Sequence, residues 1–310
     1  MKHQECRRQE GSFLLAEERE HPRVGRFISA LVIVRPGIAA GVTLAGLAGM
    51  VLAGRSLPPA EKGLLCLACI LLAACGSAVI NGLLDEEMDG RMVRLSARVS
   101  ALKSVGRRGA LVLSLSLILV ALAASWRFLN GMATVFLLAA VASYTVIYTL
   151  YFKRRSPYGT VPGGIPGALP VLIGYAAVEP RLGADGVLLF LLMLLWQPPH
   201  FWALALKYQE DYRSAGVPVL PVALGEPYTK ILIFIYAAAL LPLSLGLWWI
   251  GVCTGGYAAA AVVLGVFFLC SCLRNIVFVK RFGRAFGASI LYITGLLVAI
   301  ILDVSARGVF

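Results

Sequence analysis

Apolar segments about as long as a membrane is thick constrain this chain more than any other feature of its sequence. A helix needs roughly 20 mostly apolar residues to cross the hydrocarbon core. Only 14% of the 310 residues are charged, against about 25% in soluble domains. The sequence therefore predicts an all-α polytopic membrane protein with about nine transmembrane helices. The predicted segments lie at 28–53, 63–84, 109–126, 132–152, 161–178, 186–206, 230–252, 254–273 and 287–305.

Positive charge predicts how these segments are oriented. Cytoplasmic loops are enriched in Lys and Arg, and alternate loops of this chain hold all but five of its 28 Lys and Arg residues. We therefore expect a cytoplasmic N-terminus and a C-terminus on the opposite side. Residues 1–26 are predicted to be a polar cytoplasmic segment, and 27–310 a single transmembrane domain. The net charge of +12 lies between apolar segments, which indicates contact with membrane lipid rather than with nucleic acid.

Acidic clusters follow the second and the sixth apolar segment. In the first cluster, Asn81, Asp85 and Asp89 share one face of a continuing helix. The second contains Glu210 and Asp211. Both clusters are expected on the same side of the membrane, which indicates a site between two halves of the chain. Mg²⁺ binds such carboxylates together with phosphate oxygens. A solvated helix end, with acids that merely balance nearby arginines, is the alternative.

Basic residues accompany the acidic ones. Arg94 and Arg98 extend the face that carries Asp89 if the helix continues past Gly90. Lys153 and Arg154 end the fourth segment. With carboxylate-bound Mg²⁺, such cations would bind a diphosphate and stabilise the charge that develops as it leaves. A role in topology or in lipid binding is the alternative for each residue alone, and the gathering of both signs favours a site.

One histidine lies deep in the sixth segment. Polar residues at that depth are functional candidates, and His200 could ligate iron or transfer a proton. The simpler alternative is that it bonds a backbone carbonyl freed by Pro198 and Pro199. Cys66 and Cys69 form a C-x-x-C pair, which is compatible with a metal or redox site. Inside an apolar segment they are more typical of plain packing residues.

Several stretches, in the same order along the chain, resemble the protoheme IX farnesyltransferase family of UbiA-type intramembrane prenyltransferases. The Asp85 and Asp89 pair is typical of the whole superfamily, whereas the Pro-His-Phe and Asp-Tyr-x-x-Ala-Gly runs are typical of the haem branch. The chain departs from the family at Leu95, Val99 and Gly159, where the family has Thr, Pro and Asn. The matching stretches are 81–98, 153–157, 163–170, 196–201, 210–222 and 289–292.

The resemblance implies a UbiA-like bundle in the inner (cytoplasmic) membrane, with its active site on the cytoplasmic side. It implies Mg²⁺-dependent transfer of a farnesyl group from farnesyl diphosphate to a vinyl group of protohaem IX (haem B), giving haem O, with a downstream haem-modifying enzyme as a further partner. A prenyltransferase for an aromatic or quinone precursor is the alternative enzyme. A transporter is the alternative from another class, and the gathering of the acids at one membrane face favours an enzyme.

The resemblance also implies roles for individual residues. Catalytic roles fall to Asn81, Asp85, Asp89 and Asp211, and Mg²⁺ binding to Asp85, Asp89, Glu210 and Asp211. Diphosphate binding is expected at Arg94, Arg98, Lys153 and Arg154. Haem binding is expected at His200, as an iron partner, and at Arg155 and Arg213, as partners of the propionates.

Overall fold

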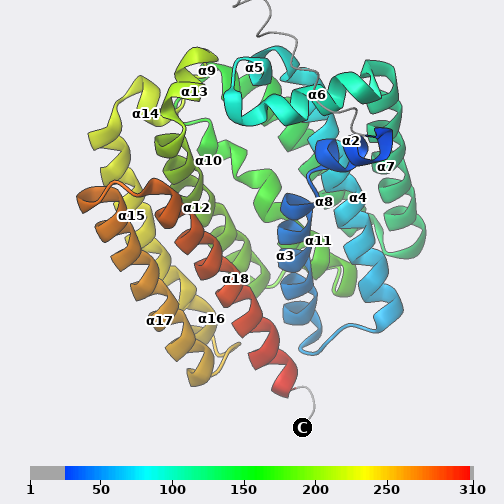
Figure 1. The fold of residues 1–310 in the computed structure, drawn as a ribbon. Coiled ribbons are helices and arrows are strands. Elements are labelled where there is room, and N and C mark those ends of the chain that lie inside the picture. The colour runs from blue at the N-terminus through cyan, green and yellow to red at the C-terminus, as the bar shows by residue number, and fades with distance from the viewer. Residues whose placement is uncertain (1–24, 308–310) are drawn as a thin grey trace, which may run out of the picture.

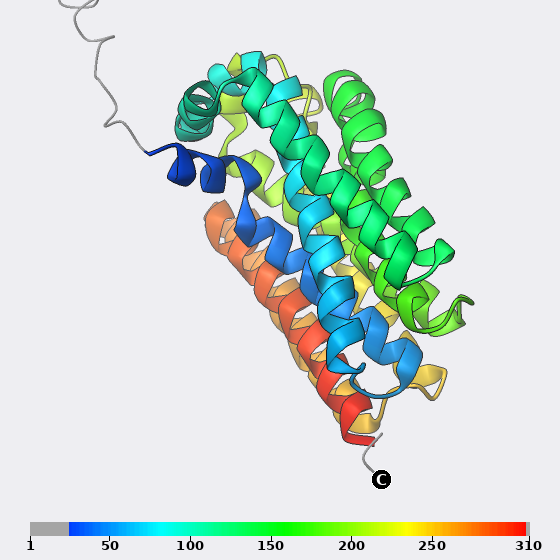
Figure 2. The same ribbon diagram turned by 90° about the vertical axis from the view of Figure 1, so that its right-hand side faces the viewer.

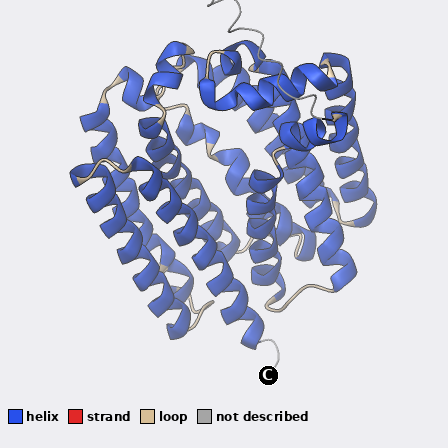
Figure 3. Cartoon of the chain, viewed as in Figure 1, coloured by secondary structure: helices blue, strands red, loops and turns tan. Residues whose placement is uncertain are grey.

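The computed structural model describes residues 25–307, and the regular elements in this range are all helices (Figures 1 and 3). Nine helices among the described residues are long and apolar enough to cross a membrane. The predicted fold class and the predicted number of spans are therefore confirmed. The boundary between a polar segment at 1–26 and a domain at 27–310 stays a prediction, because residues 1–24 lie outside the described range.

Some spans are one helix, and others join consecutive elements of different helical pitch. The elements of the spans are α3 (Pro36–Gly54), α4 (Ala60–Leu84), α7 (Arg107–Phe128), α8 (Gly131–Ala142) with η2 (Ser143–Phe152) and α9 (Lys153–Arg155), α10 (Thr160–Gly163) with α11 (Ile165–Val178), α12 (Ala184–Lys207), α15 (Glu226–Ser244) with α16 (Gly246–Trp249), α17 (Gly255–Cys272) with η3 (Leu273–Phe278), and α18 (Phe282–Arg307). Both η2 and η3 are π-helical.

The remaining helices are short and are not counted as spans. They are α2 (Arg26–Val34), α5 (Glu86–Gly90), the 3₁₀ turn η1 (Val93–Leu95), α6 (Ser96–Val105), α13 (Gln209–Ser214) and α14 (Leu220–Ala223). Figures 1 and 2 show α5, α6 and α13 at one end of the bundle, with the C-terminal end of α18 at the other. The short elements therefore cover one end of the bundle. Which side of a membrane this end faces stays a prediction.

The first span begins later than predicted. Residues 28–53 do not form one helix, because the chain turns sharply at Arg35, which has a left-handed backbone (φ 54°, ψ 58°). The residue before a proline is disfavoured in the α region, and Pro36 then opens α3 at a position that suits proline. The preceding α2 packs against α6 instead of extending the span.

Helices α3 and α11 occupy the centre of the bundle and contribute residues to both of its large buried clusters. They approach closely because glycines line their contact. A Cβ atom on Gly174 would lie 1.9 Å from the carbonyl oxygen of Gly46, and one on Gly49 would lie 2.1 Å from that of Val171. Small residues at such positions let helix backbones pack in a membrane. Cys66 and Cys69 are buried free thiols in the second cluster, in agreement with a packing role.

Candidate active site

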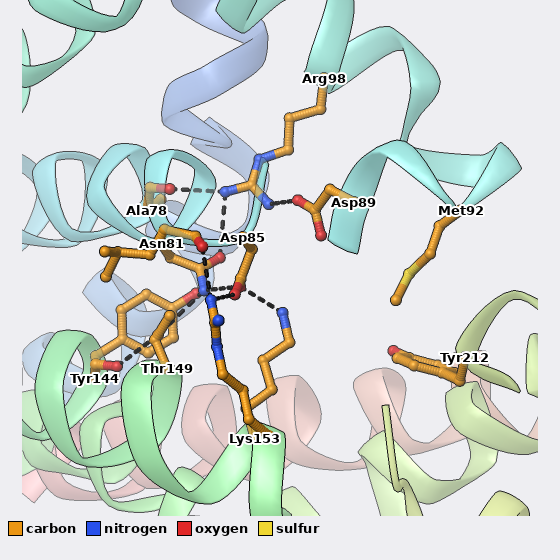
Figure 4. Close-up of polar contacts among 12 residues, drawn as sticks. Ala78, Asn81, Asp85, Asp89, Met92, Arg98, Tyr144, Thr149, Lys153 and Tyr212 are labelled. Carbon is orange, nitrogen blue, oxygen red and sulfur yellow. Dashed lines mark hydrogen bonds and ion pairs between the residues drawn. The ribbon is translucent and has the colours of Figure 1, made fainter. Parts of the chain in front are cut away.

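A buried carboxylate stands at the point where α4 ends. Asp85 follows Leu84 with a non-helical backbone (φ −100°, ψ 6°), and its side chain is fully buried. Its Oδ2 accepts hydrogen bonds from Asn81 Nδ2 at 2.7 Å and from Lys153 Nζ at 2.5 Å, while Arg154 lies 3.3 Å from Oδ1 (Figure 4). A buried charge is costly unless it is paired, and the cations at the end of the fourth span supply the pairing for this carboxylate.

The second carboxylate of the motif, Asp89, pairs with an arginine of α6 and not with the cations of the fourth span. Asp89 Oδ2 accepts a hydrogen bond from Arg98 at 2.7 Å, and the same guanidinium donates to the Ala78 carbonyl at 2.8 Å and to Asn81 Oδ1 at 3.2 Å. The other oxygen of Asp89, Oδ1, is buried and has no hydrogen-bond partner among the described residues. Burial raises the pKa of Asp89, against the opposing effect of Lys153 and Arg98.

The condition under which Arg94 and Arg98 would extend the face of Asp89, a helix that continues past Gly90, is not met. The helix changes direction at Asp85, α5 ends at Gly90, and a turn leads through η1 into α6. Arg98 meets Asp89 because α6 folds back over the end of α4, and not because the two residues share a helix face. Arg94 lies apart from Arg98 and turns toward the second acidic cluster.

A threonine that the sequence reasoning missed fixes the amide of Asn81. Asn81 Nδ2 also donates to Thr149 Oγ1 at 3.1 Å, and this hydroxyl in turn donates to the Tyr144 carbonyl at 2.8 Å, five residues back in the π-helical η2. The hydroxyl thus receives one hydrogen bond and gives one, which sets the orientation of the amide. A hydroxyl inside an apolar segment was the available signal, but several others share that property.

The second acidic cluster contacts the first through Arg94. The backbone N–H of Arg94 donates to Asp211 Oδ2 at 3.4 Å, its Nε lies 3.7 Å from the same oxygen, and its guanidinium donates to the Tyr212 hydroxyl at 2.9 Å. Its guanidinium carbon also lies 5.1 Å and 5.0 Å from the ring centres of Tyr208 and Tyr212, within the range of a cation–π contact. The loop after α4 and the helix after α12 therefore contact each other, and their role as one site stays a prediction.

Four of the predicted site residues lie outside this buried cluster, and three of them are charged. Glu210 and Arg213 pair with each other at 2.5 Å, with side chains 79% and 55% exposed. Arg155 stacks on the ring of Tyr151 at 4.6 Å. In the described part of the chain, no three His, Cys, Asp or Glu side chains converge as a metal-binding group. Each predicted metal-binding carboxylate instead faces a basic side chain, and the metal and haem roles stay predictions.

His200 occupies a different position from the cluster, within α12. Its ring stacks between Trp196 and Phe286, with centroid distances of 4.5 Å and 4.3 Å. Its Nδ1 lies 2.6 Å from the Ser289 hydroxyl. The alternative in which His200 bonds a carbonyl freed by the two prolines is wrong, because its hydrogen-bond partner in the described structure is Ser289 of the neighbouring helix α18.

The three departures from the family pattern lie in different surroundings. Leu95 packs in the buried cluster that contains Tyr212, and Val99 lines a separate surface hollow beside α6. Gly159 lines a small cavity next to Lys153. A Cβ atom on Gly159 would lie 2.6 Å from the Phe152 carbonyl oxygen, so this backbone path requires glycine.

A nine-span helical bundle with buried carboxylates and their cations gathered at one end is the architecture of an intramembrane prenyltransferase. The sequence pattern described as the UbiA prenyltransferase family matches residues 42–286 of this chain. Similar proteins named protoheme IX farnesyltransferase include one from Geotalea uraniireducens, 54% identical over 83% of this chain and 100% of its own length, and one from Aquifex aeolicus, 38% identical over 88% and 94%. The chain therefore belongs to the UbiA prenyltransferase family. This confirms the resemblance and favours an enzyme over a transporter.

Solved structures share the fold at low sequence identity. A digeranylgeranylglyceryl phosphate synthase structure matches with a TM-score of 0.74 at 17% identity, over 91% of this chain and 99% of that one. A UbiA homologue from Archaeoglobus fulgidus, described as bound to GPP and Mg²⁺, matches with a TM-score of 0.64 at 15% identity, over 88% and 99%. These likenesses support the fold.

Proposed function

We propose that this chain transfers a farnesyl group from farnesyl diphosphate to a vinyl group of protohaem IX, giving haem O, at the cluster around Asp85. One observation carries the proposal: the fully buried Asp85 carboxylate is held between Asn81 on one side and Lys153 and Arg154 on the other. An acid that could bind a metal and cations that could bind a diphosphate thus meet beside the membrane-spanning bundle. The haem acceptor follows the name of the relatives that match over nearly their whole length.

The carboxylates fit Mg²⁺. The buried Oδ1 of Asp89 lacks a hydrogen-bond partner in the described structure, and carboxylate oxygens are ligands that Mg²⁺ prefers. We propose that Asp85 and Asp89 hold Mg²⁺ on one side of the site, and that Asp211 and Glu210 form the second acidic site. When bound, Mg²⁺ neutralises charge on the diphosphate oxygens and so favours departure of the diphosphate.

The basic residues divide into two groups by their burial. Lys153, Arg154 and Arg94 have side chains that are 13%, 41% and 19% exposed, and we propose that their N–H groups bind the diphosphate. The side chain of Arg98 is 8% exposed, and both its terminal nitrogens already donate to partners. Arg98 therefore acts in this proposal as a positioning residue, which holds Asp89 and the oxygen of Asn81 in place.

A small cavity beside Lys153 is where the prenyl chain would start. Its walls include the rings of Tyr148, Phe201 and Tyr212, and its volume of about 10 Å³ has room for about one water. Substrate binding therefore requires Lys153 to leave Asp85 and the rings to move apart. Once closed around the substrate, the aromatic walls would exclude water and stabilise an allylic cation by their π faces.

The haem would lie between the cluster and the hydrophobic interior. We propose that Arg155 and Arg213, which are exposed, pair with the propionates, and that His200 contacts the iron. The site is proposed to face the cytoplasm from the inner membrane. The product, haem O, would pass to a downstream haem-modifying enzyme.

The test is a reaction with defined components. Purified protein in detergent, haem B, farnesyl diphosphate and Mg²⁺ should yield haem O, identified by its mass, and EDTA should stop the reaction. A parallel reaction replaces haem B with a hydroxybenzoate and should give no prenylated product. Prenylation of the hydroxybenzoate with haem B left unchanged would overturn the proposed acceptor.

A further inference from the structure

A cluster of aromatic and hydroxyl groups joins α12 to α18 away from the carboxylates. Ser289 is fully buried, and its hydroxyl lies 2.6 Å from both the Phe286 carbonyl and His200 Nδ1. Trp196 Nε1 donates to the Ser289 carbonyl at 2.8 Å. The imidazole is held between the rings of Trp196 and Phe286, so both its plane and one of its edges are fixed by packing.

The partners of the Ser289 hydroxyl determine the tautomer of the histidine. A hydroxyl has one hydrogen to donate, and a carbonyl can only accept. The hydrogen of Ser289 therefore goes to the Phe286 carbonyl, and the short contact with His200 requires Nδ1 to carry the other hydrogen. In this tautomer Nε2 has a free lone pair, and the described structure contains no hydrogen-bond partner for Nε2.

Resting on the proposed function, we infer that Ser289 is a positioning residue that presents His200 Nε2 as the axial ligand of the iron of the haem substrate. Histidines that ligate metals typically donate their other ring N–H to an oxygen, which fixes the ring orientation and raises the basicity of the ligating nitrogen. Ser289 supplies that oxygen here. Trp196 and Phe286 supply the ring stacking that keeps the imidazole from rotating.

The place of His200 on α12 fits this role. The next residue, Phe201, lines the cavity beside Lys153 and lies near the ring of Tyr212 at 6.1 Å. A haem bound to His200 would therefore lie on the same helical turn of α12 as Phe201, which forms part of the wall of the proposed prenyl site. Iron ligation would fix the porphyrin while a vinyl group at its edge reacts.

The experiment measures haem binding apart from turnover. Haem B is titrated into purified protein, and the iron–histidine stretching frequency of the ferrous complex is recorded by resonance Raman spectroscopy. Wild-type protein should give a histidine-ligated haem, and His200→Ala should lose that signal and regain an axial ligand when imidazole is added. Ser289→Ala should lower the stretching frequency and weaken haem binding about tenfold or more.

Two further variants separate positioning from folding. Ser289→Thr keeps a hydroxyl and should retain the wild-type frequency and affinity. Ser114→Ala removes a buried serine hydroxyl that also donates three residues back, to the Leu111 carbonyl, but that has no histidine partner, and it should change neither measurement. Wild-type values for Ser289→Ala would overturn the role of Ser289, and an unchanged iron signal in His200→Ala would overturn the ligand assignment.

The same samples distinguish failure of this inference from failure of the proposed function. Histidine-ligated haem that is never farnesylated by the wild-type protein would overturn the proposed function and leave the inference standing. Normal farnesylation together with unchanged Raman signals in both variants would overturn this inference and leave the proposed function standing.

Discussion

Asp85 and Asp89 lie four residues apart, yet different parts of the chain neutralise them. Lys153 at the end of the fourth span pairs with Asp85, and Arg98 in α6 pairs with Asp89. Removal of one partner of a buried pair costs about 3–5 kcal/mol because the other charge is left uncompensated. Isosteric amide variants are therefore a cleaner test of these carboxylates than alanine, since they keep the shape and part of the hydrogen bonding.

We expect Asp85→Asn and Asp89→Asn each to lower farnesyl transfer by at least about 100-fold, the scale associated with losing an electrostatic contact to a developing charge. Turnover is measured at matched abundance in the membrane. Glu87→Gln is the control, because Glu87 lies between the two positions with its side chain 86% exposed, and it should retain activity. Near-normal turnover in either asparagine variant would contradict the metal assignment.

Thr149 acts through Asn81, so removing its hydroxyl should lower turnover without removing a charge from the site. Thr149→Val keeps the shape but removes the acceptor of the Asn81 amide, and we expect turnover to fall about tenfold. Thr149→Ser should stay close to wild type. Thr145→Val serves as the matched control, since the Thr145 hydroxyl donates only to the Val141 carbonyl, and an equal loss in both valine variants would argue against positioning.

At the scale of elements, breaks in the helices bring the site together. The span α4 ends just before Asp85. Likewise α12 ends just before Tyr208, which has a similar non-helical backbone (φ −116°, ψ 34°) and precedes α13. In both halves a long helix is followed by a short one that carries acids. The π-helical η2 adds a third irregularity, which is common at functional sites, and it places Thr149 toward Asn81 just before Lys153.

The contact of α3 with α11 should be the element interface most sensitive to added volume. Gly174→Ala would place a methyl group 1.9 Å from the Gly46 carbonyl oxygen, and overpacking of this kind costs about 1–3 kcal/mol or more. We expect a lower midpoint of thermal unfolding in detergent. Gly41→Ala, in α3 with no atom within 4 Å of the new Cβ, should unfold like wild type, and equal midpoints for the two variants would contradict the close packing.

At the scale of the whole molecule, the nine spans among residues 25–307 are an odd number, so the two ends of this range lie at opposite ends of the bundle. The bundle carries α5, α6 and α13 at one end and the last turn of α18 at the other (Figure 1). Arg94 and Asp211 join the two halves at the first of these ends. The loops at that end also hold most of the Lys and Arg residues. This uneven distribution predicts how the bundle is oriented in the membrane.

Reporter tags should reveal this orientation in the membrane. Tags at the N-terminus, near Arg91 and near Lys280 should report the cytoplasm, because the Lys and Arg residues gather in those loops. A tag after Phe310 should report the opposite side. Reporters that place both termini on one side would contradict the nine-span arrangement, and a uniform reversal of all four would contradict only the predicted orientation.

The sequence by itself determined the number of spans, the family and the identity of the acidic and basic residues, although not where the first span begins. Hydrophobicity and charge are properties of each segment, so they can be read without knowledge of what packs against what. The tertiary structure decided which of these residues meet. Asp85 pairs with a lysine 68 residues away, Arg94 with a carboxylate 117 residues away, and His200 with a hydroxyl 89 residues away. Such pairs depend on how helices break and pack, which is why the fold of α6 over α4 and the roles of Thr149 and Ser289 emerged only in three dimensions.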